Sequence, residues 1–287
     1  VYLNIYFWGL PFLFMFNVIS SIFNSLGKST IPLAFLIFSS VLNVVLDIYL
    51  ISSWNMGIKG AAYATLIAQA LSALFSYIYL MMYLKKMTHK GSVSFFQFRI
   101  LKNMCRVAIP STVQQSIVSV GMLLIQTAVN SFGSSYIAGY TAACKIDAMA
   151  IMPIIAVGNA MSTFTAQNIG AKKTERVKSG YLSSIGMITV ISAIILIVVL
   201  IFKEPIISSF LDSESGKQAI ESGIEYISIT AYCYVFMGLM HCTNGILRGA
   251  GDASFFLLSS LISLGLRVAI VYSLMGVAGS VIIAWAA

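Results

Sequence analysis

Apolar runs long enough to cross a lipid bilayer recur along almost the whole chain of 287 residues. A membrane-spanning helix needs about 20 mainly apolar residues. Eight such runs precede a ninth that begins near residue 277, and they cover residues 2–26, 33–51, 61–84, 107–132, 136–167, 181–202, 224–247 and 255–275. In lipid each run must satisfy its own backbone hydrogen bonds, and none alternates like a barrel strand. We therefore predict an all-α polytopic membrane protein.

The composition excludes most soluble classes of protein. Hydrophobic residues make up 59% of the chain and charged residues only 9%, whereas charged residues are about 25% of a soluble domain. So few charges cannot cover a surface against water. The formal net charge of +8 would suggest a nucleic-acid partner in a soluble protein, but here it reflects basic cytoplasmic loops. We expect a multi-pass protein of the cell membrane that contacts the lipid bilayer and no nucleic acid.

The basic residues give these spans an orientation, because positively charged loops face the cytoplasm. Alternate loops, which we place in the cytoplasm, hold Lys28, Lys85, Lys86, Lys90, Arg99, Lys102, Arg106, Lys172, Lys173, Arg176, Lys178 and Arg248. The opposite loops hold only Lys59, Lys203 and Lys217. This asymmetry also supports the number of spans, since one missed helix would scramble the alternation.

A shift of 224 residues makes the chain resemble itself. Residues 2–26 then fall on 226–250, and Gly27 falls on Gly251 in a second short turn between helices. Repeated halves are common in secondary transporters, although a chance similarity between apolar segments is the alternative. We predict two six-helix lobes related by an internal repeat, the first incomplete here. Residues 1–84 would be the last three helices of the first lobe, 85–106 a cytoplasmic inter-lobe linker, and 107–287 the second lobe with its last helix truncated.

Asp47 is the most informative polar residue, because it interrupts the apolar run 33–51. A carboxylate within a span costs about 2.5–3.5 kcal/mol on an insertion scale, so such a residue faces protein or a water-filled cavity. Asn43 lies one helical turn earlier on the same face. An amide oxygen beside a carboxylate suits Na⁺, and the carboxylate can otherwise take a proton. The alternative is that Asp47 lies near the outer membrane surface and is merely hydrated.

Lys145 and Asp147 lie well inside the fifth apolar run. Two residues apart on a helix, they do not face each other directly, so both need partners elsewhere. They indicate a polar site of the second lobe, and the alternative is a structural ion pair between helices.

Four more polar residues fall within spans of the second half. Gln115 and Gln126 can share a face that lines an aqueous cavity, and polar packing between helices is the alternative. His241 can titrate near neutral pH or serve as a hydrogen-bonded core residue. Arg267 can line the pathway or extend its charge to the membrane surface.

The sequence lacks the common catalytic motifs of soluble enzymes. There is no His-Glu-x-x-His, no Gly-x-Ser-x-Gly, no paired carboxylates and no ATPase domain, so the energy for any pumping must come from an ion gradient. The cysteines are scattered without a Cys-x-x-Cys pair, which indicates free thiols rather than a disulfide or metal framework. They are Cys105, Cys144, Cys233 and Cys242.

Five stretches, in this order, resemble the MATE family of multidrug and toxin extrusion transporters. They are Asn43-x-x-x-Asp47 followed by Thr65, then Ile109-Pro110 with Gln114-Gln115, then Lys145-Ile146-Asp147, then residues 166–171, then residues 247–252. The match runs along the whole chain, from the family's fourth helix into its twelfth. We interpret the sequence as a fragment of such a protein.

The resemblance implies two six-helix lobes around a central cavity and export of organic cations or similar compounds against inward H⁺ or Na⁺. In several members a first-lobe cation site joins an Asp of the first helix to an Asn and an Asp of the fifth and a Thr of the sixth. Here the last three would be Asn43, Asp47 and Thr65, and we expect the first-helix Asp outside this sequence. Some members carry acids in the seventh and tenth helices. Here residues 114–126 and 226–247 hold no acid, so a second-lobe cation site of that type is not expected.

We therefore predict a secondary antiporter, not an enzyme, that acts as a monomer. Its substrate would be a small amphipathic or cationic molecule, its coupling ion H⁺ or Na⁺, and it would need no other cofactor. The alternative is a flippase of a lipid-linked sugar from the same superfamily. That activity would need a strongly cationic cavity, for which only Lys145 and Arg267 are candidates.

Overall fold

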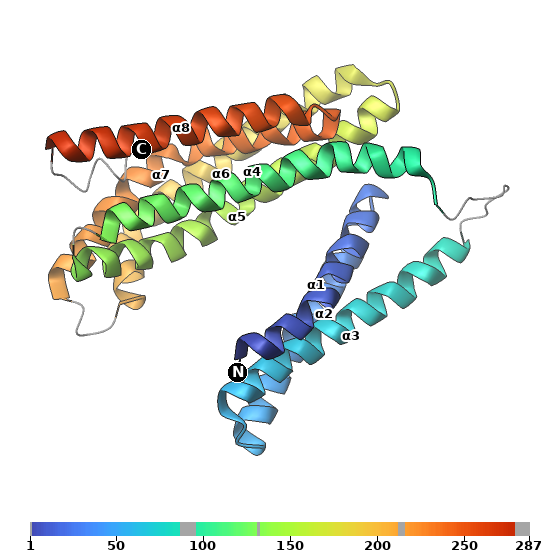
Figure 1. The fold of residues 1–287 in the computed structure, drawn as a ribbon, viewed down its shortest axis with the longest axis horizontal. Coiled ribbons are helices and arrows are strands. Elements are labelled where there is room, and N and C mark those ends of the chain that lie inside the picture. Colours follow the sequence, from blue (N-terminus) through green and yellow to red (C-terminus); the bar gives the residue numbers. More distant parts are fainter. Residues whose placement is uncertain (1, 87–95, 131–132, 212–215, 279–287) are drawn as a thin grey trace. The chain divides into compact units, whose positions relative to one another are not determined.

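The computed structural model describes residues 2–86, 96–130, 133–211 and 216–278 (Figure 1). Within these ranges the chain is helical between short turns and contains no strand. The helices form two compact units, Val1–Phe95 and Phe96–Ala287. The prediction of an all-α protein is confirmed.

Unit 1 is a bundle in which two helices pack on a third. Helix α1 (Tyr2–Ser25) and helix α2 (Thr30–Ile48) both lie against α3 (Gly57–Lys86), and α2 continues into the π-helical turn η1 (Tyr49–Ser53). The face of α3 toward its neighbours is made of small residues, which let helix backbones come close in a membrane. These buried residues include Gly60, Ala62, Ala64, Ala68, Ser72, Ala73 and Ser76.

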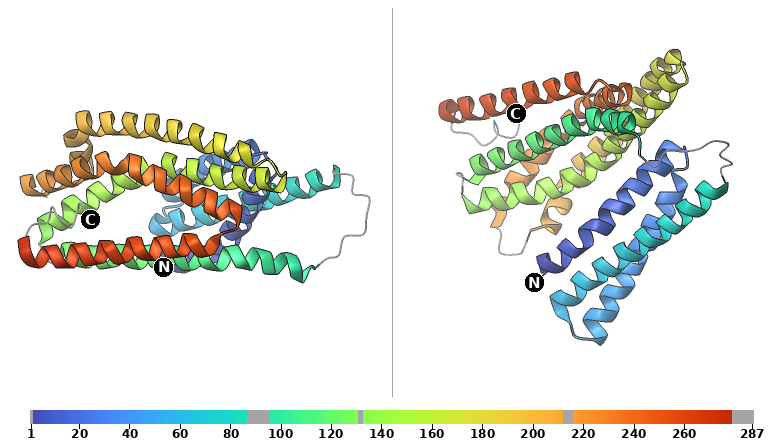
Figure 2. Two further views of the ribbon diagram at one scale, coloured as in Figure 1. Left: turned by 90° about the horizontal axis from the view of Figure 1, so that it is seen from above. Right: turned by 45° about the vertical axis from the view of Figure 1, so that its right-hand side comes forward.

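Unit 2 is built around three helices that contact one another. They are α5 (Ser134–Gly170), α6 (Thr174–Ser209) and α7 (Gly216–Ala250). Helix α4 (Phe98–Asn130) lies along α8 (Ala253–Ala278), as both views in Figure 2 show. The apolar core of the unit gathers buried side chains of α5, α6 and α7.

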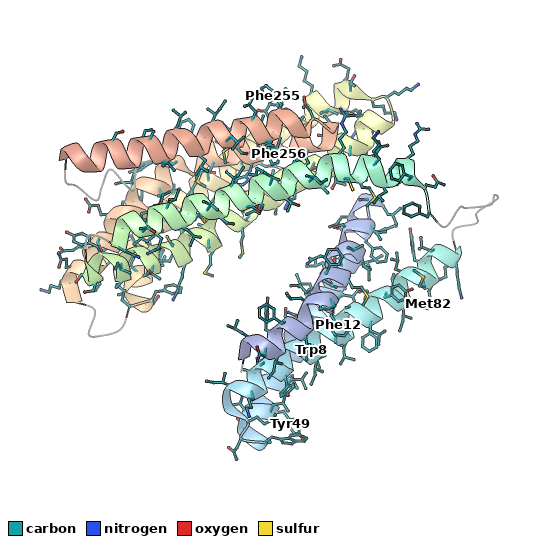
Figure 3. All side chains as sticks on the ribbon, viewed as in Figure 1. Trp8, Phe12, Tyr49, Met82, Phe255 and Phe256 are labelled. Atoms are coloured by element: carbon teal, nitrogen blue, oxygen red, sulfur yellow. The ribbon has the colours of Figure 1, made fainter. Side chains whose placement is uncertain are left out.

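Seven helices among the described residues, α1 to α7, are long and apolar enough to cross a membrane. Large apolar side chains point outward from both units (Figure 3): Trp8 is 75% exposed, and Phe255 is 59% exposed beside the buried Phe256. A water-soluble domain rarely exposes continuous apolar surface of this kind, whereas lipid accepts it. The eighth predicted span lies in α8, and the ninth lies almost entirely outside the described residues.

The helices extend further than the apolar runs indicate. Helix α3 ends at Lys86 and α4 begins at Phe98, so the predicted linker 85–106 overlaps the ends of both helices, which residues 87–97 separate. Hydropathy marks the part of a helix that faces lipid. The helical hydrogen bonds continue past it into polar surroundings, where Arg99, Lys102 and Arg106 still lie in helix α4.

The turns after α1 and α7 have the same hydrogen bonds, which supports the internal repeat. Gly27 donates its N–H to Asn24 O and Lys28 to Phe23 O; at the shift of 224 residues, Gly251 donates to Arg248 O and Asp252 to Leu247 O. Gly27 and Gly251 have positive φ values of 72° and 81°. A glycine in this conformation is the common end of a helix.

The turn between α5 and α6 repeats this pattern with a lysine in place of the glycine. Lys172 donates to Ile169 O and Lys173 to Asn168 O. Lys172 has a φ of 58°, a conformation that L-residues rarely adopt.

Helices α5 and α7 approach each other through glycines. A Cβ atom on Gly158 would lie 2.7 Å from the carbonyl oxygen of His241, and Cβ atoms on Gly245 and Gly249 would clash with the carbonyl groups of Gly158 and Ser162. Real Cβ atoms essentially never come closer than 3.0 Å to such atoms. The backbones themselves are therefore in contact along this interface.

We predict that Gly245→Ala destabilises the protein by about 1–3 kcal/mol, because the added methyl group overpacks the α5–α7 interface. Gly186→Ala on α6 is the matched control, since nothing lies within 4 Å of its added Cβ, and alanine favours a helix by about 0.5–1 kcal/mol over glycine. Thermal unfolding of the purified full-length protein in detergent measures both changes. Equal unfolding temperatures for the two variants would contradict the close contact.

Candidate functional site

Unit 1 contains a cavity of about 290 Å³ between its three helices. Its polar lining comes from amide and hydroxyl side chains: Asn17 on α1, Ser39, Ser40 and Asn43 on α2, and Thr65, Gln69 and Ser72 on α3. None of the residues that line this cavity within the described part of unit 1 is charged. The cavity can therefore form hydrogen bonds with a ligand or with water, but these lining residues provide no charged group for an ion pair.

The cavity wall is held together by hydrogen bonds between α2 and α3. The Asn43 Nδ2 group donates to Thr65 Oγ1 over 3.4 Å, and Thr65 Oγ1 donates to Ala61 O over 3.0 Å. Two serines add contacts to backbone carbonyls: Ser39 Oγ donates to Ala68 O and Ser72 Oγ to Phe35 O. The structure thus brings together two of the three residues predicted for the cation site.

Asn17 and Gln69 were missed by the sequence analysis. Thr65, Gln69 and Ser72 lie at helical spacings of four and three residues, which places them on one face of α3. That spacing is the signal that could have identified the wall. A glycine makes the arrangement possible, since a Cβ atom on Gly9 of α1 would lie 3.1 Å from Oε1 of Gln69.

Asp47 lies one turn beyond Asn43 on α2 and just before the π-helical turn η1. It is half-buried, and its Oδ1 atom has no accessible surface and no hydrogen-bond partner within the described structure. Asp47 is not among the described residues that line the cavity. A buried unpaired carboxylate oxygen is costly and calls for a partner.

Asp147 is the central polar residue of unit 2. It is half-buried on α5, and Tyr234 on α7 donates its hydroxyl hydrogen to Asp147 Oδ1 over 2.7 Å. Tyr234 is fully buried. Lys145, by contrast, is exposed, as expected for residues two apart on one helix.

The remaining predicted residues with described side chains lie on helices α4 and α7. Gln115 is exposed on α4 and Gln126 is half-buried, and the Nε2 group of Gln126 donates to Asn130 Oδ1 of its own helix. His241 is half-buried on α7, where its backbone packs against Gly158. The backbone of Arg267 belongs to α8, but its side chain lies outside the described residues.

The donor atoms of unit 1 fit a hard cation or a proton better than a transition metal. Amide, hydroxyl and carboxylate oxygens are the ligands of hard cations. In the ranges that the structure describes, no group of three His, Cys, Asp or Glu residues could hold a metal ion. All four cysteines are free thiols, as predicted.

Comparison with known proteins identifies the chain. The MatE family model matches residues 1–49 and 110–273. The chain belongs to the MATE family. It is a multi-pass protein of the cell membrane, and the family to which it belongs consists of transporters, not enzymes.

Two relatives from Bacillus subtilis (strain 168) carry related names. The probable multidrug resistance protein YpnP is 34% identical over 262 residues, which are 91% of this chain and 58% of that protein. The probable multidrug resistance protein YoeA is 28% identical over 261 residues, 87% of this chain and 55% of that protein. The chain therefore spans less than two thirds of the length of these relatives. Their names do not favour a flippase.

A solved structure confirms the fold. A MOP superfamily transporter from Pyrococcus furiosus, whose binding pocket of reverse polarity suggests a different function, has a TM-score of 0.91. The likeness covers 99% of this chain and 64% of that one at 23% identity. At this identity it supports the MATE fold and no more.

The hydrogen bond between Asn43 and Thr65 can be tested by removing one hydroxyl group. We predict that Thr65→Val destabilises the full-length protein by about 1 kcal/mol, because the Asn43 amide loses its acceptor in a part-buried position. Thr65→Ser keeps the hydroxyl and should cost less than half as much. Thermal unfolding in detergent compares the two, and an equal loss in both variants would show that the hydroxyl contact does not matter.

Proposed function

We propose that the complete protein is a secondary antiporter that exports small amphipathic or cationic molecules in exchange for H⁺ or Na⁺. The observation that carries this proposal is the polar cavity of unit 1 in a membrane-spanning MATE chain. The relatives named as probable multidrug resistance proteins support a drug or toxin as the substrate. The protein would act as a monomer, with the coupling ion in place of a cofactor, and the range 85–106 would contain the cytoplasmic connection between the lobes.

The coupling ion would bind at Asp47, with Asn43 and Thr65 beside it. Two features support this role: the buried Oδ1 atom of Asp47 without a partner, and the Asn43–Thr65 contact one turn away. A proton would neutralise the carboxylate, and Na⁺ would satisfy its oxygen together with the amide and hydroxyl oxygens.

Alternating access then requires that the ion bind unequally to the two conformations. A ligand shifts a conformational equilibrium only by its difference in affinity for the two states. Asp47 is suited to such a difference, because α2 packs on α3 and leads into η1. A change in the charge of Asp47 would alter the free energy of this packing and favour the outward-open state that releases substrate.

The test uses the full-length protein in inverted membrane vesicles with a fluorescent organic cation. We expect accumulation of the cation when a H⁺ or Na⁺ gradient is imposed, and the ion that drives it is the coupling ion. Asp47→Asn should lower gradient-driven transport at least about fivefold, the lower end of typical coupling free energies. Because the amide cannot change charge, both proton and Na⁺ coupling would suffer.

Glu225→Gln on α7 is the control, since it removes an acid that is exposed. It should transport like the wild type. No transport of the cation under either gradient would overturn the exporter proposal. Transport that survives in Asp47→Asn would place the coupling ion elsewhere in the protein.

A further inference from the structure

A second group of proton-carrying side chains lies between α5 and α7. On α5, Tyr140, Cys144 and Asp147 occur at spacings of four and three residues, so they share one helical face. On α7, Tyr226 and Tyr234 lie two turns apart on the face that meets α5. We name these five residues the Asp147 cluster.

Two contacts join α5 and α7 within the cluster. Tyr234 donates to Asp147 Oδ1 over 2.7 Å. The rings of Tyr140 and Tyr226 meet edge to face with centroids 5.2 Å apart, and Cys144 lies one turn from Tyr140 on the same face of α5.

The surroundings of the cluster are apolar. Buried Ala143, Ile146, Ile227 and Ala231 belong to the same core as Tyr234. Such surroundings disfavour an ionised carboxylate and make its charge depend strongly on its hydrogen bonds. The protonation state of Asp147 therefore depends on the hydrogen bond that it accepts from the Tyr234 hydroxyl on α7.

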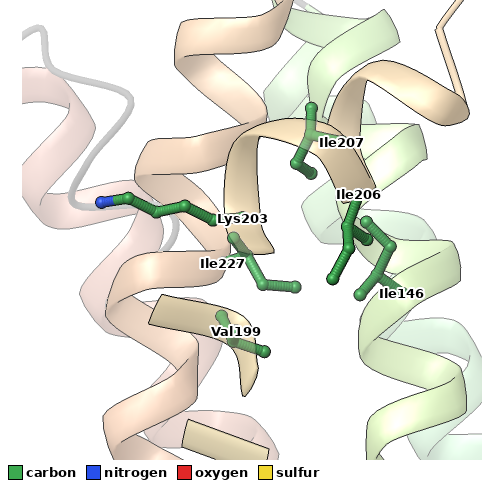
Figure 4. Close-up of a pocket in the computed structure, with 6 residues that line it drawn as sticks. All are labelled: Ile146, Val199, Lys203, Ile206, Ile207 and Ile227. Atoms are coloured by element: carbon green, nitrogen blue, oxygen red, sulfur yellow. The ribbon is translucent and has the colours of Figure 1, made fainter. Parts of the chain in front are cut away.

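Most charged groups on the neighbouring helices lie either at other heights along the helix bundle than Asp147 or on helix faces that do not meet it. Helix α4 has no charged residue between positions 107 and 130. On α6, Lys203 borders Ile146 and Ile227, but its side chain extends away from Ile146 (Figure 4), and its neighbour Glu204 is exposed. Glu225 on α7 and Lys145 on α5 are exposed as well.

The donors fit a proton better than a metal cation. Na⁺ and other hard cations need several oxygen ligands, whereas Tyr234 gives Asp147 a phenol, which in its neutral form donates hydrogen. A single carboxylate suffices for a proton. When Asp147 is ionised it accepts the hydrogen of the Tyr234 hydroxyl, and when one proton binds, the carboxylate becomes a neutral carboxyl group.

We propose that Asp147 is a reversible proton-binding site of unit 2, separate from Asn43, Asp47 and Thr65, and that Tyr234 sets the pH at which it loads. Asp147 lies about 20 Å along α5 from Ser134 at the helical rise of 1.5 Å per residue. The distribution of basic residues predicts that this end faces outward. Tyr140 and Cys144 lie between that end and Asp147, so the cluster extends toward the side from which protons would enter.

Infrared difference spectroscopy of the purified full-length protein over a pH series tests the proposal without any transport assay. Its result is thus independent of the proposed export. We expect a carboxyl band that disappears as the pH rises and that is missing in Asp147→Asn. In Tyr234→Phe, the pH at which half of the band has disappeared should rise by about one unit, because the ionised form loses a hydrogen bond.

Tyr232→Phe is the matched control, since Tyr232 is exposed on the same helix. It should titrate like the wild type. The proposal would be overturned if the wild-type spectrum had no carboxyl band that changes with pH, or if such a band persisted in Asp147→Asn. If Tyr232→Phe shifted the titration as far as Tyr234→Phe, Tyr234 would be excluded as the group that sets the loading pH. If Asp147→Asn does not fold, Tyr234→Phe still provides a test.

Discussion

The structure depends on one constraint: in lipid, each backbone N–H and C=O group must find its partner within the chain. Helices meet this requirement locally, which leaves the side chains to decide how the helices pack. Because lipid is as apolar as a leucine side chain, apolar burial alone gives little reason for two helices to associate. Close backbone contact and interhelical hydrogen bonds take over that role. Unit 1 uses a face of small residues on α3, and unit 2 uses the glycines between α5 and α7.

The same constraint gives the polar residues their meaning. A hydroxyl or amide group inside an apolar bundle must be bonded, and most here bond to another helix or to their own backbone. Asn43 and Thr65 join α2 to α3, and Tyr234 joins α7 to Asp147 on α5. The buried Oδ1 atom of Asp47 has no hydrogen-bond partner among the described residues, as is true of a few other buried side-chain atoms, such as the hydroxyls of Ser20 and Ser192. The two carboxylates thus have different surroundings, one beside an uncharged polar cavity and the other within a group of phenols.

The sequence was sufficient for the fold class, since long apolar runs in lipid allow few alternatives. It was less informative about helix ends, because residues such as Arg99 and Lys102 look like loop in a hydropathy pattern and yet continue α4. Asn43 and Thr65 were paired through the family resemblance, and the structure brings them together. Tyr234 could not have been assigned to Asp147, 87 residues away, because which faces of two helices meet is decided by tertiary packing. Asn17 and Gln69 were overlooked because single amides in apolar helices give a weak signal.

The turn at Lys172 shows how the chain combines two requirements at one position. Glycine would be the relaxed choice there, as at Gly27 and Gly251 in the turns with the same hydrogen bonds. A lysine in this conformation costs roughly 1–2 kcal/mol of backbone strain, and it places a cation beside the carbonyl end of α5, where the helix dipole partly offsets the cost. Together with Lys173 it adds fixed positive charge to this turn. The positive charge of this turn is of the kind that holds a loop on the inner side of the membrane during synthesis, which a glycine at position 172 would not supply.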